Sequence, residues 1–170
     1  SMAGRIVRIA GASGFWGDSM VGAPQLVAAG DIDYLVFDYL AETTMAILAA
    51  ARAKKPEMGY ASDFVDIAMR QVLPQVMARG IKVIANAGGI NPQGCADALH
   101  ALAASMNLAP RIAVVEGDDV SALMATLRDE GVRDMFTGKD LPPRVSSANA
   151  YLGAFPVARA LAAGAQIVIT

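Results

Sequence analysis

The chain has 170 residues, of which 55% are hydrophobic and 18% are charged, and its formal net charge at pH 7 is −2. It has no cluster of Lys and Arg of the kind that non-specific nucleic-acid binding requires, and no apolar run approaches the roughly 18 residues of a membrane-spanning helix. Its single cysteine excludes an internal disulfide.

Length, cysteine content and apolar content also predict the number of domains, the location and the oligomeric state of the protein. The length favours a single domain over residues 1–170. A lone cysteine and the absence of a signal-peptide pattern favour a cytoplasmic protein. The apolar surplus predicts a sheet covered on both faces or a subunit interface, so we expect a homo-oligomer.

A glycine-rich stretch follows the first apolar run. Residues 6–10 are typical of a buried strand, and GASGFWGDS follows at residues 11–19. Glycine allows positive φ and close approach of a ligand, and free N–H groups in such a loop can hold an anion. The alternative is a plain tight turn, and the carboxylate of Asp18 favours a hydroxyl, an amide or a ribose over a bare phosphate. The residues predicted to contact a ligand here are Gly11, Ser13, Gly14, Gly17 and Asp18.

Four more apolar runs, each preceded by a helical pattern, follow in order. Strands are predicted over residues 34–38, 81–85, 112–116 and 165–170. Helices are predicted over residues 23–30, 63–79 and 152–163. Three further helices are predicted with open bounds: one after the second strand, one that begins at Pro92 and one that ends at Gly131. Residues 132–148 form the longest irregular stretch, in which Lys139 either reaches over a bound anion or is simply solvated.

Local signals sharpen several of these boundaries. Ser62 is the predicted N-cap of the helix over 63–79, Pro74 should kink or split that helix, and Gly80 ends it. Asn91 followed by Pro92 predicts a helix that is capped by Asn91 and begins at Pro92.

Strands that alternate with helices predict an α/β fold. We expect three layers, with a mainly parallel, Rossmann-like sheet and helices on both of its faces. The final strand ends at Thr170 with no turn after it, so we expect the domain to be part of a larger one.

Polar residues follow the predicted strands, and parallel strands bring these turns to one edge of the sheet. The candidate catalytic residues are Asp38, Glu42 and Glu116. The candidate ligand-binding residues outside the glycine-rich stretch are Asn86, Gly88, Asn91, Asp118 and Asn149.

Each of these acidic groups has a structural alternative. Asp38 and Glu42 would share a helical face, as a carboxylate pair, if the helix began early; otherwise Glu42 simply favours a helix N-terminus. Glu116, Asp118 and Asp119 could hold Mg²⁺, but a helix cap is the favoured interpretation, so no metal site is assigned.

Cys95 and His100 carry weaker signals. Cys95 lies one turn into its helix without a basic neighbour in sequence, so a buried structural thiol is favoured over a reactive one. His100 is the only histidine and is off the Cys95 face of the helix, which leaves little basis for a catalytic pair or a histidine metal site.

One partial resemblance is to the extended short-chain dehydrogenases. Residues 11–17 after a strand, Asp38 at the end of the second strand and Asn86-Ala87-Gly88 match that family's pattern. Gly22 and Pro24 interrupt the helix that should follow the loop, and no tyrosine is followed four residues later by a lysine. A nicotinamide-dependent oxidoreductase is therefore the less favoured alternative.

The chain as a whole resembles the N-terminal portion of the acyclic terpene utilisation family. The resemblance rests on ordered segments at residues 14–18, 33–42, 86–92, 114–119, 137–138 and 147–155. It implies a role in bacterial citronellol and geraniol breakdown, which runs through acyl-CoA thioesters. Members are several times longer, so we expect a longer native protein.

The resemblance indicates a pathway and leaves the reaction open. The expected function is an enzyme or enzyme subunit of acyclic terpene catabolism that binds a small-molecule ligand, an acyl-CoA or related acid. The alternative is a non-catalytic binding or scaffolding subunit of the same pathway. The sequence assigns no cofactor.

Overall fold

A five-stranded parallel sheet organises the molecule. The computed structural model describes residues 4–13, 22–39, 42–117, 124–131, 133, 135–140 and 153–170. All neighbouring strands are parallel, and their order across the sheet is β1-β2-β3-β5-β4. The predicted parallel α/β fold is therefore confirmed. The strands are β1 (Ile9–Ser13), β2 (Tyr34–Asp38), β3 (Lys82–Ala85), β4 (Ile112–Val114) and β5 (Ile167–Ile169).

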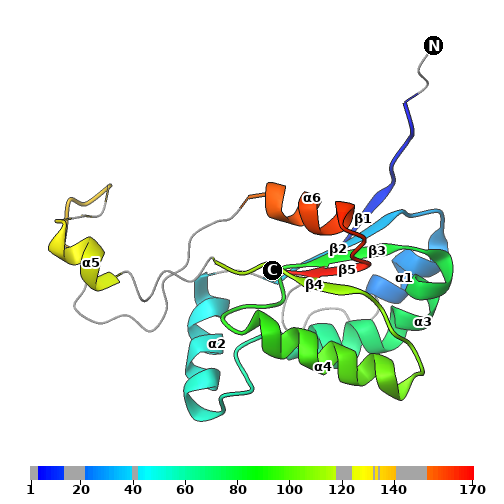
Figure 1. Ribbon diagram of the computed structural model, residues 1–170, viewed down its shortest axis with the longest axis horizontal. Helices are drawn as coiled ribbons and strands as arrows, with labels where there is room; N and C mark the ends of the chain where they lie inside the picture. Colours follow the sequence, from blue (N-terminus) through cyan, green and yellow to red (C-terminus); the bar gives the residue numbers. More distant parts are fainter. Residues whose placement is uncertain are drawn as a thin grey trace.

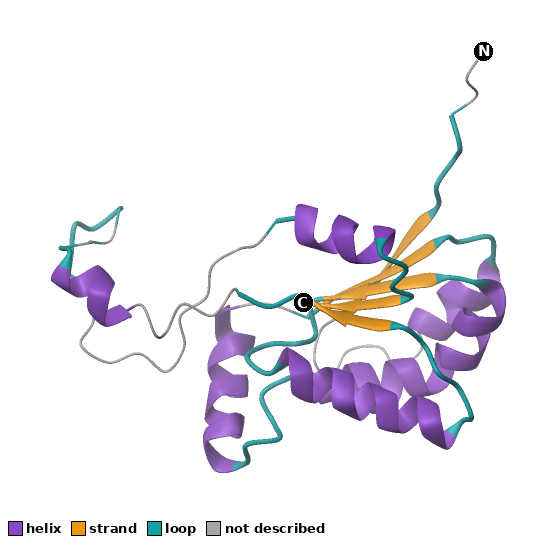
Figure 2. Cartoon of the chain, viewed as in Figure 1, coloured by secondary structure: helices purple, strands orange, loops and turns teal. Residues whose placement is uncertain are grey.

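Helices cover both faces of this sheet. Figure 1 shows α1, α3 and α4 beneath the sheet and α6 above it, which gives the predicted three layers. Helix α2 stands beside the edge of the sheet at which the strands end, and α5 lies apart from the sheet (Figures 1 and 2). The helical elements are α1 (Gly22–Ala29), α2 (Glu42–Lys54), the π-helix η1 (Phe64–Met69), α3 (Arg70–Arg79), α4 (Pro92–Ser105), α5 (Met124–Asp129) and α6 (Phe155–Ala162).

The main core lies between the sheet and the α1, α3 and α4 layer. Leu35 and Phe37 alternate along β2 with the less buried Tyr34 and Val36, as the two-residue period of a strand requires. In β5, all three residues are buried because this central strand is covered on both faces. Burial of each such large apolar side chain contributes about 1.5–3 kcal/mol to stability.

The opposite face is less completely covered. Helix α6 has no buried residue, and Phe155 at its start is 83% exposed. Near β1, Ile6 is 73% exposed and Ile9 is 67% exposed. Some of the large apolar side chains of the described residues therefore stay exposed to solvent instead of packing in the core.

The first strand differs from its prediction. The apolar run at residues 6–10 is shifted relative to β1, which pairs with β2 from Ile9 opposite Tyr34 to Ser13 opposite Asp38. Pairing sets this register, and a short apolar run does not encode it. Gly11 and Ser13 therefore belong to the strand and not to the loop in which they were predicted.

The long helix is also only partly as predicted. Helical structure begins at Ser62, so this residue is not the predicted N-cap, and Phe64–Met69 adopt π-helical geometry. Pro74 neither ends nor splits the helix, since α3 continues through it to Arg79. Gly80 ends it with φ +66, as predicted, because glycine enters the left-handed region without steric cost.

Within the described ranges, no helix is long and apolar enough to cross a membrane.

Candidate functional site

The strand ends bring the predicted residues to one edge of the sheet. From β1 to β4 the order along this edge is Ser13, Asp38, Asn86, Thr170 and the segment Val115-Glu116. Backbone bonds fix the alignment: the Val115 N–H donates to the Ile169 carbonyl at 2.8 Å, and the Thr170 N–H donates to the Ala85 carbonyl at 2.9 Å. Among the described residues, Ser13, Asp38, Asn86 and Glu116 therefore lie at the carboxyl edge of the sheet.

Asn86 joins the ends of β2 and β3 through its side-chain amide. Its Nδ2 donates to Asp38 Oδ1 at 2.6 Å, and its Oδ1 accepts from the Tyr39 backbone N–H at 2.5 Å. The Asn86 backbone N–H donates to the Phe37 carbonyl at 3.3 Å. Asn86 thus bonds both the Asp38 side chain and the backbone that leaves β2.

The turn after β3 is held closely by other parts of the chain. The Gly88 N–H donates to the Thr170 carbonyl at 2.9 Å. A Cβ on Gly89, which has φ +56, would lie 2.5 Å from the Gly59 carbonyl oxygen. These glycines therefore serve close backbone packing; a ligand contact by Gly88 remains a prediction.

Asn91 has the structural role that its position predicted. Its Oδ1 accepts from the Gly94 N–H at 3.0 Å and caps α4, in which Pro92 is the first residue. Its Nδ2 donates to the Met58 carbonyl at 3.0 Å. Both ends of the amide thus have protein partners, while its predicted contact with a ligand stays untested.

The three candidate catalytic carboxylates are not gathered into one cluster. Asp38 is the last residue of β2 and α2 begins at Glu42, so the two do not share a helical face. Three strand spacings separate β2 from β4, which places Asp38 and Glu116 roughly 14 Å apart along the edge. A small ligand would meet one of them, whereas an extended ligand could span both.

The connections identify the part of the edge where a cleft is expected. The chain leaves β3 toward α4 below the sheet, whereas α6, the helix that precedes β5, lies above it (Figure 1). In open parallel sheets, ligands bind where such connections diverge. In this sheet that position lies around β5, between Asn86 and Glu116, and not at β1.

The strand order also bears on the dehydrogenase alternative. The usual dinucleotide-binding order 3-2-1-4-5 has the glycine-loop strand in the interior of the sheet. Here β1 pairs only with β2 among the described strands. Asp38 ends β2 opposite Ser13 of β1, as in that order, so the difference lies in the position of β1 in the sheet.

A buried aromatic and thiol cluster lies behind the edge. The ring centroids of Phe37 and Phe64 are 5.2 Å apart in an edge-to-face arrangement, and Tyr39 packs against both rings. Burial raises the pKa of Tyr39 to about 12, with smaller contributions from Asp63 and Cys95. The Tyr39 phenol is therefore neutral at physiological pH.

Cys95 is buried, as predicted. Its side chain has no exposed area, and burial raises the pKa of the thiol to about 12. The residue is thus a protonated core side chain. His100 is exposed on the same helix.

An open groove of about 430 Å³ is lined in part by Asn91, one of the predicted ligand-binding residues. It runs between the 55–60 connection and the first turns of α4 and is lined by residues that include Glu57, Tyr60 and Asp97. The sequence did not indicate it, because it depends on how this connection packs against α4. Burial raises the pKa of the Tyr60 phenol.

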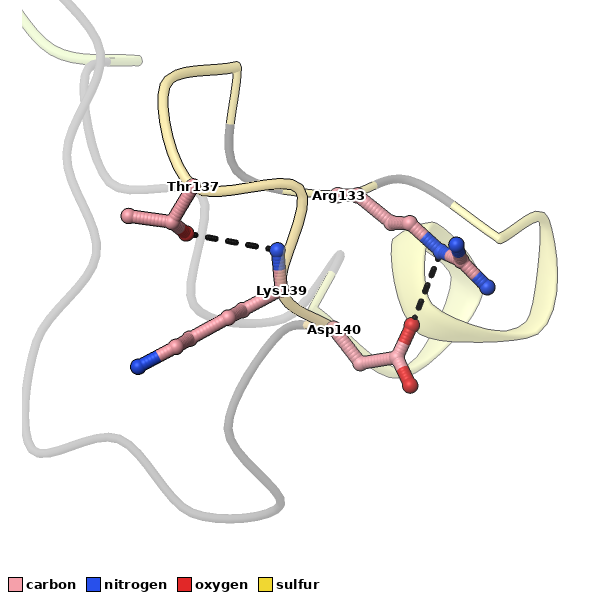
Figure 3. A network of polar contacts seen from close by, with 4 residues as sticks. All are labelled: Arg133, Thr137, Lys139 and Asp140. Carbon is pink, nitrogen blue, oxygen red and sulfur yellow. Dashed lines mark hydrogen bonds and ion pairs between the residues drawn. The ribbon is translucent and has the colours of Figure 1, made fainter.

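The irregular stretch contains a small solvent-exposed network. Arg133 Nε and Asp140 Oδ1 are 3.0 Å apart, and the Lys139 N–H donates to Thr137 Oγ1 at 3.3 Å (Figure 3). Both partners of the ion pair are mostly exposed, so this pair adds little stability. The Lys139 side chain extends away from the network, in keeping with its solvated alternative.

Several predicted ligand contacts lie outside the described residues. They are Gly14, Gly17, Asp18, Asp118 and Asn149. The possible Mg²⁺ ligand Asp119 also lies outside. Among the residues that are described, no group of three or more His, Cys, Asp or Glu side chains has the arrangement of a metal site.

Comparison with known proteins identifies the family. Residues 7–170 match the model of the acyclic terpene utilisation family protein AtuA. The chain belongs to the AtuA family. Searches of curated proteins and of solved structures found no match. AtuA-family membership confirms the resemblance carried by the turn residues, and it assigns no reaction to them.

Proposed function

We propose that this AtuA-family chain binds a small-molecule intermediate of acyclic terpene catabolism at the carboxyl edge of its sheet. The ligand class is an acyl-CoA or a related acid, and the chain acts as an enzyme or enzyme subunit. The observation that supports this proposal best is Asp38, whose carboxylate accepts a 2.6 Å hydrogen bond from Asn86 at the end of β2. A side chain fixed in this way suits proton transfer, because its geometry is set before the ligand binds.

The remaining candidates complete the proposed site. Asp38 is the acid–base group, and Glu42 and Glu116 are further candidates for that work. An acyl-CoA would bring its acyl end to these carboxylates, because carboxylates repel its phosphates. The sequence proposes further ligand contacts at Gly11, Ser13, Gly14, Gly17, Asp18, Gly88, Asn91, Asp118 and Asn149, whereas the amide of Asn86 bonds Asp38.

A non-catalytic scaffolding subunit is the second candidate function. The exposed apolar side chains of Ile6, Ile9 and Phe155 favour it, since exposed apolar side chains are available for contact with a partner. This function requires no ligand at the carboxyl edge. The proposed homo-oligomer is compatible with either function.

Thermal unfolding of the 170-residue chain with candidate ligands tests the proposal. The panel contains a terpenoyl-CoA, free coenzyme A, adenine nucleotides, nicotinamide dinucleotides and Mg²⁺. A ligand at one hundred times its dissociation constant stabilises the fold by about 2.7 kcal/mol. We expect a shift with the terpenoyl-CoA that Asp38→Asn reduces to about half or less.

Asp33→Asn is the matched control, because Asp33 lies at the opposite end of the same strand. Its Oδ2 accepts from the Arg8 N–H at 2.9 Å, away from the carboxyl edge. This variant should retain the ligand shift. A shift with a nicotinamide dinucleotide alone would support the oxidoreductase instead, and no shift with any ligand would favour the scaffolding subunit.

A further inference from the structure

The side-chain amide of Asn86 is directed at the protein. Its Oδ1 accepts from the Tyr39 N–H and its Nδ2 donates to Asp38 Oδ1. Sequence reasoning treated Asn86 as a ligand contact, but one donor and one acceptor of its amide are already bonded to the protein, which fixes the plane of the amide.

The geometry points to a positioning role: we propose that Asn86 acts on the ligand through Asp38 and not by touching the ligand itself. Two bonds of one rigid amide tie together the end of β3, the carboxylate that ends β2 and the next backbone N–H. A bond from an amide N–H to a carboxylate is charge-assisted and therefore stronger than a neutral one. Asn86 thus selects the orientation in which the Asp38 carboxylate is presented at the edge.

The backbone around Asn86 makes it suitable for this role. The Asn86 backbone N–H donates to the Phe37 carbonyl on one side. On the other side, the Thr170 N–H donates to the carbonyl of Ala85, the residue before Asn86. The amide therefore extends from a strand end that is anchored on both sides. A side chain on such an anchor holds its partner more precisely than one on a free loop.

This inference rests on the proposed function, and a double-mutant cycle separates the two. Dissociation constants for a terpenoyl-CoA are measured for the original chain, Asp38→Asn, Asn86→Ala and the double variant. We expect each single substitution to weaken binding about tenfold or more. In the Asp38→Asn background, Asn86→Ala should cause no further loss of affinity, because the carboxylate that Asn86 positions is already absent.

A reciprocal exchange separates positioning from a purely structural role. In the variant carrying Asp38→Asn and Asn86→Asp together, the new amide at 38 can donate to the new carboxylate at 86, which restores the hydrogen bond with reversed polarity. The melting temperature should recover relative to Asn86→Asp alone, while ligand binding should stay weak because residue 38 lacks its carboxylate. If both residues acted in stability alone, the melting temperature and ligand binding would recover together.

Gln166→Ala is the matched control for loss of a side-chain amide. Gln166 Oε1 accepts from the Arg111 N–H at 2.8 Å, at the opposite edge of the sheet. Its loss should lower the melting temperature and leave the dissociation constant unchanged.

Three outcomes would overturn the inference in distinguishable ways. If Asn86→Ala weakens binding equally in both backgrounds, Asn86 contacts the ligand directly. If Asp38→Asn weakens binding and Asn86→Ala does not, the positioning role fails while the proposed function stands. If Asp38→Asn leaves binding intact, the proposed function fails and the positioning role fails with it.

Discussion

The N–H of Gly88 donates to the carbonyl oxygen of Thr170 at 2.9 Å, and a Cβ at position 88 would lie 2.6 Å from that same oxygen. The same Cβ would also lie 2.6 Å from Pro92 Cβ. The turn after β3 and the end of β5 therefore lie in direct backbone contact, with no room for a side chain between them. Any side chain at position 88 must move one of these neighbours.

Gly88→Ala should destabilise the fold by about 1–3 kcal/mol, the usual cost of overpacking a close-packed site. The measurement is urea unfolding of the purified chain. Gly30→Ala is the control, because a Cβ there meets no described atom within 4 Å. Equal stabilities of the two variants would show that the turn relaxes without cost.

The two bonds of Asn91 should be separable by substitution. Asn91→Ala loses the α4 cap and the bond to Met58, so we expect a loss of about 1–3 kcal/mol. Asn91→Asp keeps the capping oxygen and loses only the donor, so its loss should be smaller. Chemical denaturation gives both values, and equal losses would mean that the cap contributes nothing.

Local chemistry explains which parts of the fold were predictable from sequence. Strand β2 was predicted residue for residue, and the Asn91-Pro92 start of α4 and the Gly80 end of α3 were also correct. Each of these depends on a cap, a left-handed glycine or a bounded apolar run, which a few neighbouring residues determine.

Long-range pairing explains what was missed. The position of β5 between β3 and β4 and the register of β1 depend on contacts between distant segments, and the apolar runs look alike. The π-helical geometry of Phe64–Met69 has no sequence signal that we recognise.

The candidate site was predicted only in outline. Asp38, Asn86 and Glu116 were expected at one edge, because parallel strands bring their carboxyl ends together. The sequence did not show that Asn86 bonds Asp38, nor that Glu116 lies three strands away, since both depend on strand order.

Phe64 should be among the most sensitive core positions. Its ring is fully buried and packs edge-to-face against both Phe37 and Tyr39. Phe64→Ala should cost about 3–5 kcal/mol in unfolding free energy. Phe64→Leu keeps more of the buried volume and should cost less, so equal losses in thermal unfolding would argue against this packing.

Buried Cys95 and Tyr39 should make the fold sensitive to alkaline pH. The folded pKa of Cys95 is about 12, above its ordinary value of 9.0, and that of Tyr39 is about 12, above 10.0. In both cases the folded state holds the proton more tightly, so this contribution is full below the ordinary pKa. It is lost as pH rises toward 12, at up to about 1.4 kcal/mol per pH unit for each group.

Unfolding free energies measured between pH 8 and 11 check this prediction. Cys95→Ala should flatten the decline that begins near pH 9, and Tyr39→Phe should flatten only the part above pH 10, because each substitution removes one titrating group. Burial also raises the pKa of Tyr60, so part of the decline above pH 10 should remain in Tyr39→Phe. If the Cys95→Ala profile kept the original slope from pH 9 to 10, the thiol would have to be accessible to solvent in the folded protein.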